Sequence, residues 1–181
     1  MQETESSERN KTMKNNVILI GMPGVGKSTI GVILAKVLNL DFIDSDIVIQ
    51  QEMGMRLKEI IAQQGIDGFN ATENRINSQI NANDSVIATG GSAVYGADAM
   101  AHFKEIGQVV YLRIAYKDLQ ERLGDLDERG VVHRPEQTLL DLYNERTALY
   151  EQYADIIVDV ESFDIHGTVL DLLKELNLKL V

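Results

Sequence analysis

The sequence predicts a three-layer α/β/α fold built around a five-stranded parallel sheet. Short apolar runs alternate with stretches of helical spacing from Asn16 onward, and the first run leads directly into a glycine-rich loop. Strands that are separated by helices must be joined by crossovers, which make neighbouring strands parallel and cover both faces of the sheet. No internal repeat, low-complexity segment or linker interrupts this alternation, so one domain is expected over residues 16–181.

The apolar runs set the expected strands, and the helical spacing sets the expected helices. Strands are predicted at 17–20, 42–43, 86–88, 109–112 and 156–160. Helices are predicted at 28–38, 46–52, 57–64, 67–80, 97–105, 117–123, 137–153 and 165–176. Residues 1–15 are almost entirely polar and are expected to form a disordered tail.

The loop at 21–29 reads GMPGVGKST and fits the phosphate-binding pattern G-x-x-x-x-G-K-[ST]. Its position between a strand and a helix is the context that the pattern needs, because glycines turn backbone N–H groups inward and the helix N-terminus attracts anions. Lys27 is expected to reach the terminal phosphates of ATP, and Ser28 to ligate Mg²⁺. The competing interpretation is a glycine-rich turn that merely carries a lysine. The predicted nucleotide-binding residues are Gly24, Val25, Gly26, Lys27, Ser28 and Thr29.

The composition narrows the class of protein. The 181 residues carry a formal net charge of −11, which argues against nucleic acid as the main partner, because a phosphate backbone needs a basic face. The three histidines are far apart and no cysteine is present, so no thiolate metal site or disulfide is expected. No apolar run is long enough to span a membrane, and no signal peptide is evident. We expect a cytoplasmic monomer that acts on a small molecule.

Polar residues follow the second predicted strand as Asp44-Ser45-Asp46. Ligands of such folds gather at the carboxyl ends of the strands. One carboxylate is suited to hold Mg²⁺ or its waters, and the other to accept a proton from a substrate hydroxyl. The alternative is that Ser45 or Asp46 only caps the following helix.

Two further segments are candidates for the same edge of the sheet. After the third strand, Thr89-Gly90-Gly91-Ser92 allows close approach of a ligand to the backbone, with a plain tight turn as the alternative. The polar segment at 124–137 carries Arg129 and Arg134 and resembles a lid that brings cations over a transferring phosphate. Its arginines would otherwise pair with acidic residues of a solvated loop.

Taken together, these features resemble the shikimate kinases, small enzymes of the nucleoside monophosphate kinase group with a P-loop kinase fold. The resemblance runs from about residue 17 to 160. It rests on GMPGVGKST (21–29), FIDSD (42–46), LKEIIAQQGIDGFNATE (57–73), VIATGGSAV (86–94), VVYLRI (109–114) and ERTALYEQYADIIVDV (145–160).

The resemblance implies transfer of the γ-phosphate of ATP to a hydroxyl of shikimate, under a closing lid. By position, Asp44 would support Mg²⁺, while Asp46 would bind the substrate hydroxyls and act as the base. The acceptor-binding helical segment would lie at about 46–80. Gly90 and Gly91 would line the acceptor site, and Arg146 would grip the acceptor carboxylate.

Three departures from the family pattern concern the acceptor and the lid. Asn70 follows Phe69 where the family has an arginine that forks onto the shikimate carboxylate, although its partner Glu73 is retained. Ser92 replaces the third glycine of the acceptor run, and Arg134-Pro135 is not followed by two leucines. An amide cannot replace a bidentate guanidinium, and losing such a contact costs about 2–4 kcal/mol. Arg75 is one candidate to compensate, and a surface charge is the other interpretation of it.

The sequence therefore predicts an ATP-dependent phosphotransferase acting on a hydroxyl group, with shikimate as the first acceptor. A kinase for a different small hydroxyl compound is the alternative that Asn70 and Ser92 indicate. A nucleotide-binding regulatory protein without turnover is the second alternative. The retained Lys27, Ser28, Asp44 and Asp46 argue against it.

Overall fold

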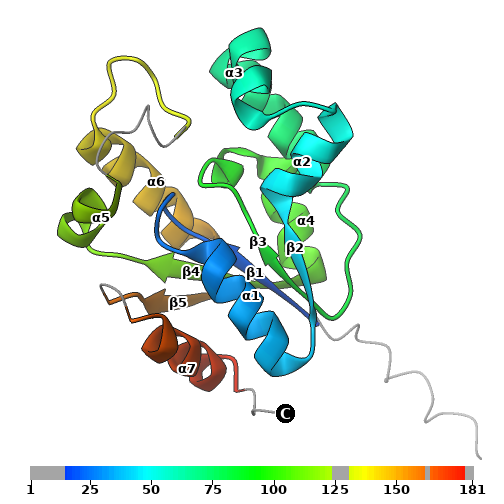
Figure 1. The fold of residues 1–181 in the computed structure, drawn as a ribbon, viewed down its shortest axis with the longest axis vertical. Helices are drawn as coiled ribbons and strands as arrows, with labels where there is room; N and C mark the ends of the chain where they lie inside the picture. Colours follow the sequence, from blue (N-terminus) through cyan, green and yellow to red (C-terminus); the bar gives the residue numbers. More distant parts are fainter. Residues whose placement is uncertain (1–14, 124–130, 162–163, 178–181) are drawn as a thin grey trace, which may run out of the picture.

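The structure is a computed structural model that describes residues 15–123, 131–161 and 164–177. Its five strands are β1 (Asn16–Ile20), β2 (Asp41–Asp44), β3 (Ser85–Ala88), β4 (Gly107–Arg113) and β5 (Ile156–Asp159). All pair in parallel in the order β2-β3-β1-β4-β5 (Figure 1). The predicted five-stranded parallel sheet is confirmed.

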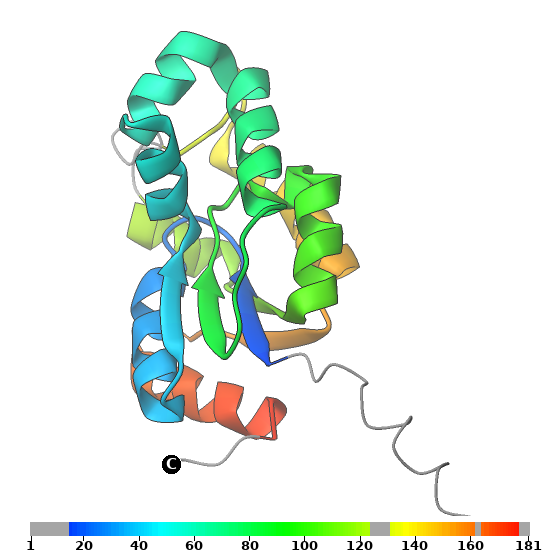
Figure 2. The same cartoon turned by 90° about the vertical axis from the view of Figure 1, so that its right-hand side faces the viewer.

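Helices cover both faces of the sheet. On one face lie α1 (Lys27–Leu38) and α7 (Ile165–Glu175), and on the other lie α4 (Ala97–Ile106) and α6 (Leu139–Tyr153), as the edge-on view shows (Figure 2). Helix α5 (Tyr116–Leu123) follows β4. The central strands are buried on both sides: every residue of β1 and β3 is buried, because each meets helices above and below the sheet. The three-layer prediction is therefore correct.

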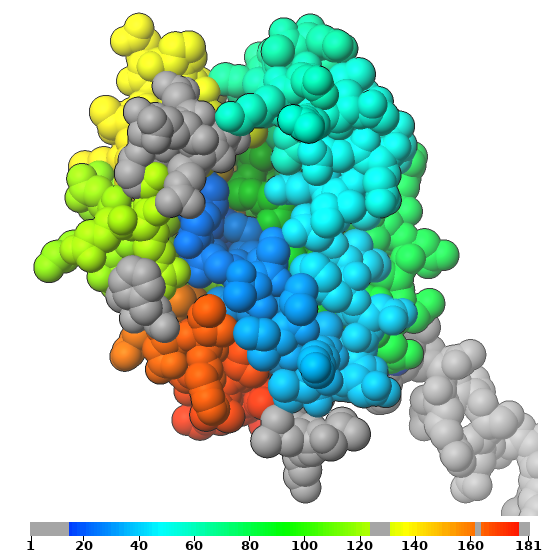
Figure 3. All heavy atoms as spheres, viewed as in Figure 1, coloured from blue at the N-terminus to red at the C-terminus, as the bar shows by residue number. Residues whose placement is uncertain are grey.

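Helices α2 (Ser45–Met53) and α3 (Leu57–Asn77) stand beyond the carboxyl edge of the sheet (Figures 1 and 2). A separate small core of Ile49, Ile60, Phe69 and Ile76 holds them together. This pair forms one wall of the site. The space-filling view shows a hollow between the blue residues of the glycine-rich loop and the cyan residues of α2 (Figure 3).

Several predicted helix boundaries were wrong by a few residues. The two helices predicted at 57–64 and 67–80 are parts of α3, which bends at Gly65 (φ 70°, ψ 179°) and ends at Asn77 rather than at residue 80. Helix α6 begins at Leu139, not at residue 137, because the Thr138 side chain caps it by accepting from the Asp141 N–H. A short 3₁₀ helix, η1 (Ala93–Tyr95), was not predicted. Among the described residues, no helix is long and apolar enough to cross a membrane.

Candidate active site

The glycine-rich loop joins β1 to α1 in the way that phosphate binding needs. Gly24 (φ 81°) and Gly26 (φ 106°) take left-handed backbone angles that side chains disfavour. A Cβ on Gly24 would also lie 2.7 Å from Leu123 Cδ2, so a larger residue would require the Leu123 side chain to move. The first turn of α1 carries no acidic residue, which leaves its N-terminal N–H groups open to an anion. These features favour a phosphate cradle over a plain turn.

Lys27 lies inside this loop. Its Nζ donates to the carbonyls of Gly21 (2.7 Å) and Met22 (2.9 Å), which uses two of its three N–H groups. Burial lowers the pKa of Lys27 to about 8; the nearby Arg146 also lowers it, while Asp46 and Asp44 raise it. The group is thus a largely protonated cation at neutral pH, held at the loop that would carry the phosphates.

Ser28 and Asp44, the two residues expected to hold Mg²⁺, are in direct contact. Ser28 Oγ donates to Asp44 Oδ2 over 2.7 Å, and Asp44 Oδ1 accepts from the backbone N–H of Asp46 at 3.0 Å. Asp44 is therefore the residue that caps α2, whereas the capping alternative had named Ser45 or Asp46. Ser45 Oγ instead accepts from the Gly90 N–H at 3.3 Å and ties α2 to the end of β3.

A hydroxyl and a carboxylate in contact fit Mg²⁺, which takes one or two protein oxygens and completes its shell with phosphates and water. No group of three or more histidine, cysteine or acidic side chains gathers into a metal site within the described residues. The part of the chain that the structure describes thus offers no all-protein cage for a metal. The Ser28–Asp44 pair suits a metal ion that arrives with a nucleotide.

Asp46 faces the end of β3. A Cβ on Gly90 would lie 2.7 Å from Asp46 Oδ1 and 2.7 Å from Glu73 Oε1, so only glycine lets both carboxylates approach here. Burial raises the pKa of Asp46 to about 6, the charge of Asp44 raises it further, and Lys27 opposes the shift. A carboxylate with a raised pKa is a better proton acceptor near neutral pH than an ordinary aspartate.

The glycine pair at 90–91 is required by the protein's own side chains. Neither residue has a positive φ, so the turn geometry does not demand glycine. A Cβ on Gly91 would lie 2.8 Å from Pro23 Cδ and 2.9 Å from Arg146 Nη1. The Tyr150 hydroxyl fixes the same residue by donating to the Gly91 carbonyl at 2.6 Å. The pair thus lets the phosphate loop and Arg146 converge on one point.

Ser92 and Glu73 form a buried hydrogen-bonded pair. It joins Ser92, one departure from the family pattern, to the acid that was expected to partner the arginine missing at Asn70. Ser92 Oγ donates to Glu73 Oε2 over 2.6 Å, while Glu73 Oε1 has no hydrogen-bond partner among the described residues. Burial raises the pKa of Glu73 to about 7; Asp46 adds to the shift, and the Ser92 hydrogen bond and Arg146 oppose it. The hydroxyl of Ser92 therefore provides the hydrogen bond that Glu73 Oε2 accepts.

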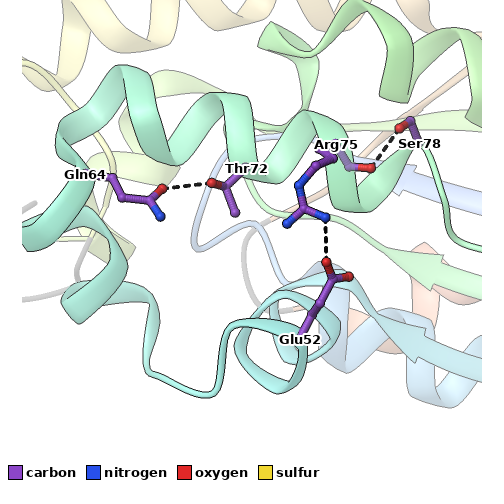
Figure 4. Close-up of polar contacts among 5 residues, drawn as sticks. All are labelled: Glu52, Gln64, Thr72, Arg75 and Ser78. Atoms are coloured by element: carbon purple, nitrogen blue, oxygen red, sulfur yellow. Dashed lines mark hydrogen bonds and ion pairs between the residues drawn. The ribbon is translucent and has the colours of Figure 1, made fainter.

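Asn70 lies one turn before Glu73 on α3 and lines a small cavity of about 200 Å³. Its Oδ1 is buried and has no partner among the described residues. Arg75 does not compensate for the missing arginine: its Nη1 pairs with Glu52 Oε1 at 2.6 Å on the surface, as Figure 4 shows. With 49% of its side chain exposed, the surface-charge interpretation of Arg75 is the correct one.

Arg146 enters the same cavity from α6, and only 1% of it is exposed. Its Nη2 donates to the Val132 carbonyl at 2.5 Å, and its guanidinium lies 5.4 Å from the centre of the Tyr95 ring. None of the ion pairs within the described part of the chain includes it. A buried cation that lines a cavity without a carboxylate partner is suited to bind an anionic group.

Only part of the predicted lid is described. Residues 124–130, including Arg129, lie outside the described residues. Arg134 is exposed and lines the cavity that Asn70 and Arg146 share, at the end of the segment that continues into α6. The structure thus brings Arg134 to the acceptor side of the site.

A second cavity, of about 400 Å³, opens on the other side of the phosphate loop. Predicted loop residues, including Thr29, form one wall, and residues from the end of α5 and the segment between β5 and α7 form the other. Arg122 Nη1 donates to the Val25 carbonyl at 3.1 Å and so joins α5 to the loop. The sequence showed no base-recognition motif here, because residues far apart in the sequence come together to form this wall. It consists of Glu121, Arg122, Val160, Glu161, Asp164, Ile165 and Thr168.

Comparison with known proteins agrees with this arrangement. The shikimate kinase family model matches residues 23–177. The shikimate kinase of Pasteurella multocida is 36% identical over 171 residues, which cover 91% of this chain and 98% of that protein. Shikimate kinase 2 of Yersinia enterocolitica is 35% identical over 154 residues, which cover 81% of this chain and 87% of that protein.

Solved structures show the same likeness. The Acinetobacter baumannii shikimate kinase in complex with shikimate has a TM-score of 0.81 and 29% identity, covering 90% of this chain and 93% of that one. The Aquifex aeolicus shikimate kinase has a TM-score of 0.76 and 30% identity, covering 90% and 96%. On the strength of the family match across most of its length, the chain belongs to the shikimate kinase family.

Proposed function

We propose that this protein transfers the γ-phosphate of ATP to a hydroxyl of shikimate, giving shikimate 3-phosphate. The observation that carries this is that Asp46 and Arg146 lie beside two consecutive residues, Gly90 and Gly91, next to Pro23 of the phosphate loop. Asp46 offers a base for a hydroxyl, and Arg146 a buried cation for a carboxylate. A relative with the same architecture has been solved with shikimate bound.

The residues have distinct tasks in this reaction. Lys27 and the N–H groups of the loop hold the phosphates of ATP and neutralise the charge that grows on them. Arg146 orients the acceptor through its carboxylate. Asp46 takes the proton of the acceptor hydroxyl as its oxygen bonds to the γ-phosphorus, and the bond from that phosphorus to the bridging oxygen breaks to release ADP. Arg134 and Arg129 are the candidate lid cations.

The metal and the base of ATP have separate sites. Ser28 and Asp44 would hold Mg²⁺, and such an ion neutralises phosphate charge and orients the transferring group. The cavity of about 400 Å³ beside Arg122 is the proposed place for the nucleotide base, because it continues from the phosphate loop on the side away from Asn70. Gly90 and Gly91 serve the acceptor by letting Asp46 and Arg146 converge.

A different hydroxyl compound is the second candidate acceptor, and one observation favours it. Asn70 places a neutral amide in the acceptor cavity, and the described part of that cavity holds Arg146 and Arg134 as its arginines. The Ser92 hydroxyl, in turn, already donates its hydrogen bond to Glu73. A regulatory protein without turnover is not favoured, since Lys27, Ser28, Asp44 and Asp46 are all in place.

The test is direct detection of the product. The purified protein is incubated with ATP, Mg²⁺ and shikimate, and phosphorus NMR follows the conversion of ATP into ADP and a new phosphate ester. We expect one ester that forms only when shikimate is present. ATP consumption that depends on another hydroxy acid or polyol, with no ester from shikimate, would replace shikimate with that acceptor.

We also propose that residues 16–181 act as one monomeric domain in the cytoplasm.

A further inference from the structure

We propose that Tyr95 is a positioning residue for the acceptor: its hydroxyl holds Glu145 away from Arg146 and so keeps the guanidinium available for the carboxylate of the substrate. This inference rests on the proposed function. Tyr95 ends η1, four residues after Gly91 of the glycine pair, and Glu145 precedes Arg146 on α6. All three residues line the acceptor cavity.

The hydroxyl of Tyr95 lies between the acid and the cation. It donates to Glu145 Oε1 over 2.5 Å, and it accepts from Arg146 Nε at 3.4 Å. Burial raises the pKa of Tyr95, and the hydrogen bond to Glu145 raises it further, so the hydroxyl keeps its proton and remains a donor to the acid. One oxygen atom, the Tyr95 hydroxyl, is therefore hydrogen-bonded to both the carboxylate and the guanidinium.

The second oxygen of Glu145 is also held. Gln137 Nε2 donates to Glu145 Oε2 at 3.0 Å. The turn that carries Gln137 is closed on itself, because the Gln137 N–H donates to the Arg134 carbonyl at 3.0 Å and Gln137 Oε1 accepts from the Arg134 N–H at 3.3 Å. Glu145 is thus fixed at both oxygens by neutral donors, Tyr95 and Gln137, and by no cation among the described residues.

The position of Glu145 matters because Arg146 forms no ion pair among the described residues. Its polar contacts are with the Val132 carbonyl and the side chains of Tyr95 and Tyr150, and none of these carries a charge. A carboxylate that moved onto the guanidinium would form a buried ion pair, and an incoming substrate would have to break it. Because Asn70 stands where the family has an arginine, the substrate depends more heavily on Arg146 in this chain. Removing the Tyr95 hydroxyl should therefore weaken acceptor binding through Glu145.

A double-mutant cycle separates this role from simple packing. We expect Tyr95→Phe to raise the KM for shikimate about five- to tenfold, with kcat and the KM for ATP within about twofold. In the Glu145→Gln background the same change should have little effect, because no competing charge is left. Tyr143→Phe is the matched control: that tyrosine is also half-buried, and its hydroxyl donates to the Ile114 carbonyl at 2.8 Å, away from the pair.

Two outcomes would overturn the inference: no rise in KM for Tyr95→Phe, or an equal rise with and without Glu145→Gln. A second measurement needs no acceptor: the rate at which the Arg146 Nε–H proton exchanges with solvent, measured by NMR. The resonance of this proton is assigned by its disappearance from the spectrum of Arg146→Lys. Exchange should slow in Tyr95→Phe, as the new ion pair forms, and not in the double variant; equal rates in all variants would contradict the positioning role. If the wild type fails to phosphorylate shikimate, the proposed function fails, and the exchange rates still decide the role of Tyr95.

Discussion

The two halves of the site differ in how closely they follow the family. In the nucleotide half, the loop, Lys27 and the Ser28–Asp44 pair are all present and in contact. In the acceptor half, Asn70 replaces an arginine, and Ser92 replaces a glycine and binds Glu73. We infer from this difference that the ATP site keeps the family pattern, while the proposed acceptor site is organised around Arg146. Substitutions in the two halves should therefore affect different kinetic constants.

The largest effect is expected in the nucleotide half. Lys27→Met removes the cation at the phosphates and should lower kcat by at least about a hundredfold. Because Lys27 also donates to two loop carbonyls, a small loss of thermal stability is expected along with it. Lys36→Met, an exposed lysine on the same helix, is the matched control. If folded Lys27→Met keeps a kcat close to that of the wild type, the proposed role of the loop in phosphate transfer is wrong.

A second change in this half concerns the metal. Asp44→Asn keeps an oxygen to cap α2 but removes the negative charge beside Ser28. We expect the Mg²⁺ concentration for half-maximal rate to rise about tenfold or more. Asp41→Asn, at the exposed start of the same strand, should leave it unchanged. A magnesium titration with equal midpoints for both variants would exclude Asp44 as the metal residue.

In the acceptor half, Asn70→Arg should restore the missing cation. We expect the KM for shikimate to fall about tenfold, while the KM for ATP stays the same, since the change lies on the far side of the phosphate loop. Ala71→Arg adds the same charge at the next, exposed position and controls for long-range attraction. If both variants improve binding equally, then net charge and not a contact at position 70 explains the gain.

The smallest effect concerns pH and Glu73. Its pKa is raised in the folded protein to about 7, so its contribution to stability is fully present below the unfolded pKa and is lost as pH rises through about 7. Glu73→Gln should come closest to the wild type in stability at pH 5, just above the unfolded pKa of 4.5, and should be more stable than the wild type above pH 7. The difference should grow by at most about 1.4 kcal/mol per pH unit. Denaturant unfolding from pH 5 to pH 8, with exposed Glu105→Gln as control, measures it; a constant difference would contradict the raised pKa.

Local patterns predicted much of the fold. The strands and the phosphate loop follow from apolar runs and a motif of contiguous residues, and their existence and order were predicted correctly. The departure at Asn70 was visible as well. Its consequence was not, because Ser92 and Glu73 are far apart in sequence and meet only when α3 packs on the end of β3. The same holds for Tyr95, Gln137 and Glu145, which no local pattern connects.

The most direct test of the account compares shikimate with its methyl ester as acceptors, for the wild type and for Arg146→Met. If Arg146 binds the acceptor carboxylate, the wild type should prefer shikimate in kcat/KM by about tenfold or more, and Arg146→Met should abolish that preference. Equal use of both compounds by the wild type, or a preference that survives in Arg146→Met, would contradict the claim that the acceptor half is organised around Arg146.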